Sequence, residues 1–111
     1  MKQTFTCPVE LALDVLGGKW RAVILAHVKE GAQRYSDLRR CIPRMSEKML
    51  TQRLHELVKT GLLVKRSGSY RLTARGDRAR AVLEALHTWG KSLVPELGVR
   101  IEPPSLHEKL R

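Results

Sequence analysis

Apolar residues recur every three or four positions over most of the chain, and this spacing predicts α-helices. The first predicted helix starts at Pro8, with Cys7 as its N-cap, and Gly17 and Gly18 end it. The second starts at Trp20 and is almost wholly apolar. A helix that is hydrophobic on nearly all sides is buried, so we expect this one at the centre of the domain.

Two shorter helices follow and are separated by a tight turn. Ser36 is expected to cap the third helix, which Pro43 closes, and Ser46 is expected to cap the fourth. The apolar stripe of the fourth helix consists of Leu50, Leu54, Leu57 and Val58. The opposite face carries Lys48, Gln52, His55 and Lys59. Two short helices around a tight turn, the second with a basic outer face, are typical of a helix-turn-helix.

The apolar spacing becomes that of β-strands in "LLVKR" and "SYRLT". These segments flank Ser67 and Gly68, which suit a two-residue hairpin turn. Thr73 is then expected to cap a last helix over residues 74–93. The pattern therefore predicts a mainly α fold with a small β-hairpin (α+β), arranged as a winged helix-turn-helix.

The last predicted helix carries an apolar seam. Its members, Val82, Leu86, Trp89 and Leu93, recur at spacings of four, three and four residues. The length of the chain suits one modest core, so we expect a single domain over residues 1–111, with its core at about 7–94 and a polar tail at 98–111. The seam is wider than so small a domain needs to cover and predicts a partner helix.

The positive charge of the chain is concentrated in one region. Lys and Arg number 21 against 11 Asp and Glu, which gives a formal net charge of +10. Residues 44–80 hold ten basic and three acidic side chains, so the fourth helix and the hairpin lie in the most basic part. A local positive field indicates a polyanionic partner, either nucleic acid or a membrane surface.

Membrane, disulfide-rich and metal-binding proteins fit the sequence poorly. The longest aliphatic run, "AVILAHV", is too short to span a bilayer, and the first residues lack a signal-peptide pattern, so we expect a cytoplasmic protein with no membrane partner. Two cysteines are too few for a disulfide framework. Neither they nor the four histidines have the spacing of metal ligands, so we expect no metal and no cofactor.

The fourth predicted helix, with its basic outer face, is the candidate recognition helix. A helix of this kind fits the major groove of double-stranded DNA, where its outer side chains meet base edges and phosphates. Gln52 is the best candidate for base reading, because its amide pairs bidentately with adenine. The predicted DNA contacts are Arg34, Ser36, Ser46, Lys48, Met49, Thr51, Gln52, Arg53, His55, Lys65, Arg66 and Arg71. The alternatives are a solvated helix face, ordinary capping around Ser36 and solvated charges on the strands.

Five blocks of the sequence stand in the order of a known family. They are "CPVELALDVLGGKWRAVILAHV", "YSDLRR", "SEKMLTQRLHEL", "GLL" and "YRLTARG", and they resemble the HxlR-type winged helix-turn-helix transcription regulators over residues 5–92. The resemblance implies a cytosolic homodimer, formed by the first and last helices, that binds an inverted-repeat operator near a promoter. The chain departs from the family at the hairpin, because family wings carry several more residues than Ser67 and Gly68 between the strands.

Cys7 is a candidate sensor of oxidants or electrophiles. Its predicted place at a helix N-terminus favours the reactive thiolate, because unpaired N–H groups and the helix dipole stabilise negative charge there. It also resembles the N-terminal sensing cysteine of some HxlR-type regulators. The alternative is a modest N-cap held by packing. Cys41 is expected to be a small core residue without a chemical role.

Three other functions stay open. A winged-helix module can bind RNA or a protein, since the fold does not fix its partner. A MarR-like regulator responds to a small ligand in a dimer cavity, although the short chain and the early Cys7 argue against this interpretation. A small cysteine enzyme needs a histidine base beside Cys7 or Cys41, and no such pair is evident at local spacing.

Overall fold

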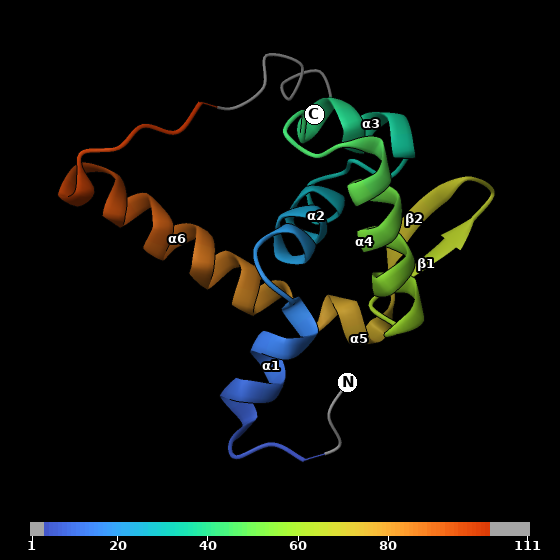
Figure 1. Cartoon of the computed structure of the whole chain (residues 1–111), viewed down its shortest axis with the longest axis horizontal. Helices are drawn as coiled ribbons and strands as arrows, with labels where there is room; N and C mark the ends of the chain where they lie inside the picture. Colours follow the sequence, from blue (N-terminus) through green and yellow to red (C-terminus); the bar gives the residue numbers. More distant parts are fainter. Residues whose placement is uncertain (1–3, 103–111) are drawn as a thin grey trace.

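The computed structural model describes residues 4–102. Its elements are α1 (Pro8–Leu16), α2 (Trp20–Lys29), α3 (Tyr35–Cys41), α4 (Glu47–Lys59), β1 (Leu63–Arg66), β2 (Ser69–Leu72), α5 (Ala74–Asp77) and α6 (Arg80–Leu97). Helix α2 lies at the centre and contacts α3, α4, α6 and β2, whereas α1 and α6 project from this body (Figure 1). The predicted mainly α fold with one hairpin is confirmed.

The core forms where the apolar stripes of the central helices meet. Its fully buried side chains are Ile24, Leu25, Leu38, Met45, Leu50, Leu54, Leu57 and Leu63. Burying each such side chain stabilises the fold by roughly 1.5 to 3 kcal/mol. Ile42 and Met45 belong to the turn between α3 and α4 and are buried as well. Packing of this turn therefore fixes the angle between the two helices.

The hairpin has the predicted two-residue turn. Leu63 pairs with Leu72 and Arg66 with Ser69 in an antiparallel register. Ser67 and Gly68 both have positive φ, 51° and 78°, as a type I′ turn requires. A short third segment adds to β2 on its other side: the Tyr70 amide donates to the carbonyl of Gln33 at 2.7 Å, and Arg34 forms a bridge with Ser69.

The predicted capping role of Ser36 is wrong. Helix α3 begins at Tyr35 with Arg34 at the N-cap, two residues before the predicted cap, so Ser36 lies inside the first turn. Pairing with β2 holds residues 33–34 extended, and the chain enters the helix directly afterwards. The Asp37 carboxylate, not a serine, accepts from the Arg34 amide, at 3.4 Å.

The predicted last helix is divided in two and is longer than expected. Thr73 caps α5 as predicted, since its Oγ1 accepts from the Gly76 amide at 3.0 Å. A Cβ on Gly76 would lie 2.1 Å from the Leu62 carbonyl oxygen, so this backbone contact holds α5 against the start of β1. The chain turns at residues 78–79, and α6 then continues to Leu97, where Gly98 takes the left-handed conformation that ends it.

Helices α1 and α6 differ from the rest in being poorly covered. Helix α1 has the predicted bounds but no buried residue, and Leu83 is the one buried residue of α6. Within residues 4–102, no helix has the length and apolar character needed to cross a membrane. Of the predicted tail at 98–111, residues 103–111 lie outside the described part of the chain.

Candidate nucleic-acid interface

Helices α3 and α4 are joined by polar contacts as well as by the buried turn. The Tyr35 hydroxyl donates to the carbonyl oxygen of Glu47 at 3.3 Å and accepts from Thr51 Oγ1 at 3.5 Å. Arg39 donates to the carbonyl oxygen of Met45 in the turn. Ser46 Oγ accepts from the Met49 amide at 3.1 Å, which confirms Ser46 as the N-cap of α4. These contacts hold the first turn of α4 in a fixed position.

The outer face of α4 is exposed and slightly hollowed. An open depression is lined by Tyr35, Glu47, Lys48, Thr51, Gln52 and His55. The opposite face of the helix lies in the core through Leu50, Leu54 and Leu57. A helix held from behind in this way presents its polar side chains without moving its backbone. Four of the predicted contacts, Lys48, Thr51, Gln52 and His55, therefore lie together on one free surface.

Two other predicted contacts on α4 are partly engaged within the protein. Met49 is half-buried and packs against the core. Arg53 is also half-buried, and its Nε lies 3.2 Å from Oε1 of Glu56. The geometry of this ion pair does not meet the requirements of a hydrogen bond, and Arg53 Nε has no hydrogen-bond partner within residues 4–102. Both residues thus lie on the flank of the exposed face and not at its centre.

The hairpin divides its cations between its two sides. Residues directly paired across strands share a face, and neighbours along a strand alternate. Lys65 pairs with the buried Tyr70, and its Nζ lies 5.5 Å from the centre of that ring. Arg66 pairs with Ser69 and therefore lies on the opposite, outer side.

Arg34 joins the outer side of the hairpin from another part of the chain. Its bridge with Ser69 places it in one cross-strand row with Arg66, and Arg71 follows two positions after Ser69 on the same side. None of these three guanidinium groups has a carboxylate partner within residues 4–102. Ser36, in the first turn of α3, is exposed close to Arg34 in sequence. The structure thus gathers three unpaired guanidinium groups beside the helix-turn-helix.

The predicted seam of α6 is largely uncovered. Val82, Leu86 and Trp89 are 46%, 44% and 62% exposed, and Leu93 is half-buried. Helix α1 adds exposed apolar side chains of its own, among them Val9 and Leu13. The two projecting helices therefore present apolar surface of the kind that marks a protein interface.

The two cysteines have different surroundings. Cys7 is exposed at the N-cap of α1, and its sulfur accepts no hydrogen bond from the helix. Cys41 is buried in α3, where burial raises the pKa of its thiol, the charge of Asp37 raises it further and that of Arg40 lowers it. Helices α1 and α3 lie at opposite ends of the molecule (Figure 1). Cys41 is therefore an unreactive core thiol, distant from Cys7.

Residues 15–97 match the sequence model of a family described as HxlR-like helix-turn-helix. The chain belongs to this family. YtcD of Bacillus subtilis, an uncharacterized HTH-type transcriptional regulator, is 38% identical over 96 residues, which cover 80% of this chain and 76% of YtcD.

Two solved structures are similar to this HxlR-like chain. The redox regulator HypR in its reduced form is 31% identical, with a TM-score of 0.73 over 83% of this chain and 98% of HypR. Quinone-bound YodB from Bacillus subtilis is 31% identical, with a TM-score of 0.69 over 78% of this chain and 99% of YodB. The fold of this HxlR-like protein is thus that of helix-turn-helix transcriptional regulators.

Sequence reasoning missed one residue that links the parts of this HxlR-like fold. The Arg21 guanidinium lies 2.9 to 3.0 Å from Glu56 Oε1, the same oxygen that Arg53 approaches. Its Nη1 donates to the carbonyl oxygens of Asp14 and Val15 at the end of α1, each at 3.2 Å. Arg21 is a charged residue in an otherwise apolar stretch, and this was the available signal.

Proposed function

We propose that the protein is a transcriptional regulator that binds double-stranded DNA as a homodimer, at an inverted-repeat operator, in the cytoplasm. The observation that supports this most directly is the exposed outer face of α4, whose backbone is fixed by the core and by Tyr35. A recognition helix needs such a surface, since base contacts tolerate little movement. Membership of a helix-turn-helix family supports the same proposal.

The contacts divide into base reading and phosphate binding. Gln52 and Lys48 lie on the free face of α4, where an amide can pair with adenine and an ammonium with guanine or phosphate. Arg34, Arg66 and Arg71 bind phosphates beside the groove, because unpaired guanidinium groups favour such contacts. The two-residue turn makes the hairpin short, so its role is to grip the backbone.

Dimerisation places two such surfaces on one duplex. The exposed apolar side chains of α1 and α6 supply the interface, with Val82, Leu86, Trp89 and Leu93 at its centre. A two-fold axis then repeats the recognition helix, and inverted-repeat operators have the same symmetry.

The defining experiment measures discrimination between operator and random DNA. The operator is first selected from a random duplex library with the wild-type chain. Gln52→Ala should lose about 1 to 3 kcal/mol of preference for the selected site, whereas Lys59→Ala, at the far end of the same face, should keep it. A wild-type protein whose duplex binding is abolished by excess RNA, or which selects no site, contradicts the proposal and favours an RNA or protein partner.

Cys7 is the proposed site of redox or electrophile control. Its thiol is exposed, it stands at a helix N-terminus, and the structures of similar fold include the redox regulator HypR and quinone-bound YodB. Diamide or a quinone should change operator binding of the wild type and of Cys41→Ser but not of Cys7→Ser. An equal response of Cys7→Ser and wild type removes this role.

A further inference from the structure

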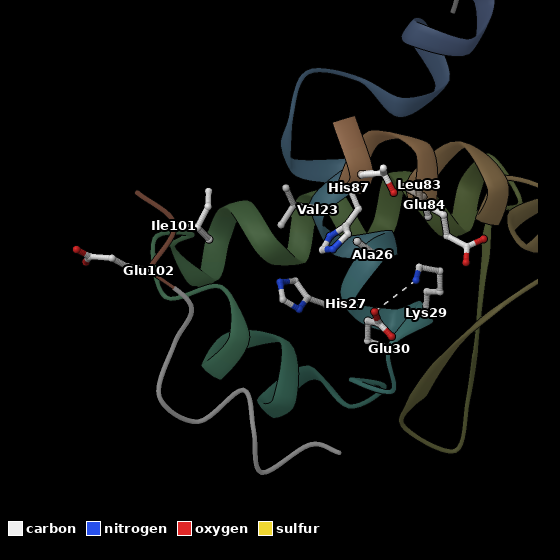
Figure 2. A pocket seen from close by; sticks show the side chains of 11 residues that line it. Val23, Ala26, His27, Lys29, Glu30, Leu83, Glu84, His87, Ile101 and Glu102 are labelled. Carbon is white, nitrogen blue, oxygen red and sulfur yellow. Dashed lines mark ion pairs between the residues drawn. The ribbon is translucent and has the colours of Figure 1, made fainter. Parts of the chain in front are cut away.

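The structure contains a cavity that DNA binding does not use. It lies between α2 and α6, is closed at one end by residues 101–102, and has a volume of about 700 Å³ (Figure 2). Its floor and walls are apolar, formed by Val23, Ala26, Leu83 and Ile101. Side chains of His27 and His87 project into the same space from the two helices. Cavities of about 300 to 1,000 Å³ with mostly apolar walls are the usual sites of small ligands.

The charged groups around this cavity favour one kind of ligand. Lys29 forms an ion pair with Glu30 at 3.5 Å, and Glu102 forms one with Arg100 at 2.9 Å. Glu84 has no basic partner within residues 4–102. A bound anion thus finds no unpaired lysine or arginine in the lining, whereas a bound cation finds the carboxylate of Glu84. This preference is opposite to that expected from the net charge of +10.

The cavity lies away from the proposed dimer seam. At roughly 100° per residue, the α6 positions that line it are centred nearly opposite the seam. The lining positions are Leu83, Glu84, His87 and Thr88, and the seam positions are Val82, Leu86, Trp89 and Leu93. A second copy that covers the seam therefore leaves this side of α6 accessible.

We propose that this cavity binds an amphipathic organic cation with an apolar body. The apolar walls bury the body of the ligand, and its charge pairs with Glu84 at the edge of the cavity, where the carboxylate lies on the side of Lys29 and outside the space between His27 and His87 (Figure 2). A ligand in this position touches both α2 and α6 and so fixes the angle between them. Its effect on operator binding rests on the proposed function, but its binding to the cavity does not.

The test uses three bulky triphenyl probes that differ in charge: methyltriphenylphosphonium, neutral triphenylphosphine oxide and triphenylacetate. Calorimetry with the full chain and no DNA should show the phosphonium binding about ten-fold tighter than either other probe, because the attraction of one nearby opposite charge is of the order of the 1.4 kcal/mol that a ten-fold ratio represents. The phosphonium should also shift the ring resonances of His87. Equal affinity for all three probes, or no phosphonium binding at millimolar concentration, overturns the proposal.

Matched variants locate the site. Glu84→Gln should weaken phosphonium binding about five-fold, as expected for removal of one partly solvated charge, and leave the phosphine oxide unaffected. Glu96→Gln, on the same helix but outside the lining, should behave as wild type. Thr88→Trp, at an exposed lining position, should block all probes without affecting the fold. Equal behaviour of the two glutamate variants, or binding that occurs in monomeric protein alone, overturns the assignment.

Discussion

The two ends of this 111-residue molecule expose different kinds of side chain. Around α3, α4 and the hairpin, the apolar side chains are inside and unpaired arginines and a polar helix face are outside. At α1 and α6 the opposite holds, since large apolar side chains remain exposed and few are buried. The first end suits the proposed contact with a charged polymer, and the second suits the proposed contact with another protein surface.

Arg21 is the polar connection between these two ends. It holds the last carbonyls of α1 with one nitrogen and Glu56 of α4 with the others. Since α1 has no buried residue, these bonds and the packing of Val15 and Leu16 determine where α1 lies. The Glu56 carboxylate also contacts Arg53, so Arg21 links the end of α1 to two side chains of α4.

The largest effect is expected from a charge in the apolar end. Leu86→Glu should convert the dimer to a monomer in sedimentation and reduce operator affinity by about 10² or more, because two linked half-sites bind with high effective concentration. Its fold should persist, since Leu86 is exposed in the single chain. Lys91→Glu, on the opposite side of α6, should stay dimeric. A wild type that is already monomeric at micromolar concentration rules out the seam as an interface.

An intermediate effect is expected from cutting the connection between the ends. Arg21→Met should lower the free energy of unfolding by about 1.5 to 3 kcal/mol, the range for hydrogen bonds to charged groups, as measured in urea. Hydrogen exchange should accelerate at the amides of α1. Arg80→Met is the control, because the Arg80–Asp77 pair is exposed and is expected to contribute at most about 1 kcal/mol. Equal decreases in the two variants would mean that Arg21 has no linking role.

The smallest effect is expected from removing a single cation from one side of the hairpin or from the other. Arg66→Ala removes an outward guanidinium and should reduce the slope of log affinity against log salt by about 0.9 for each DNA phosphate that is no longer neutralised. Lys65→Ala removes a cation that lies over Tyr70 and should change the slope less. The measurement is binding to random duplex at several salt concentrations. A larger change for Lys65→Ala reverses the assignment of the DNA-facing side.

Local chemistry made part of this structure predictable. The Ser46 cap and the Ser67–Gly68 turn depend on residues within a few positions, and the structure confirms both. The start of α3 depends on pairing between Gln33 and Tyr70, which are distant in sequence, and so the cap predicted at Ser36 is wrong. The sequence period likewise did not predict the break between α5 and α6 at residues 78–79, or the close contact of Gly76 with Leu62.

The candidate site shows the same division. The helical spacing of the sequence predicted that Lys48, Gln52 and His55 share one face, and in the structure they lie together on the exposed face of α4. Period alone did not show that Arg53 is drawn toward Glu56, or that Arg34 joins Arg66 across the sheet. Such neighbours are set by tertiary packing, so sequence reasoning identified the correct residue types but not which of them act together.

The contact between Gly76 and the Leu62 carbonyl has a consequence for the length of DNA that the proposed dimer would span. Helix α6 has 18 residues and is a lever about 27 Å long that starts just beyond this contact. A tilt of about 10° at its base moves its far end by about 5 Å, which exceeds the rise of one base pair, about 3.4 Å. In the proposed dimer, a larger side chain at position 76 is therefore expected to change the spacing between the half-sites that the two protomers reach.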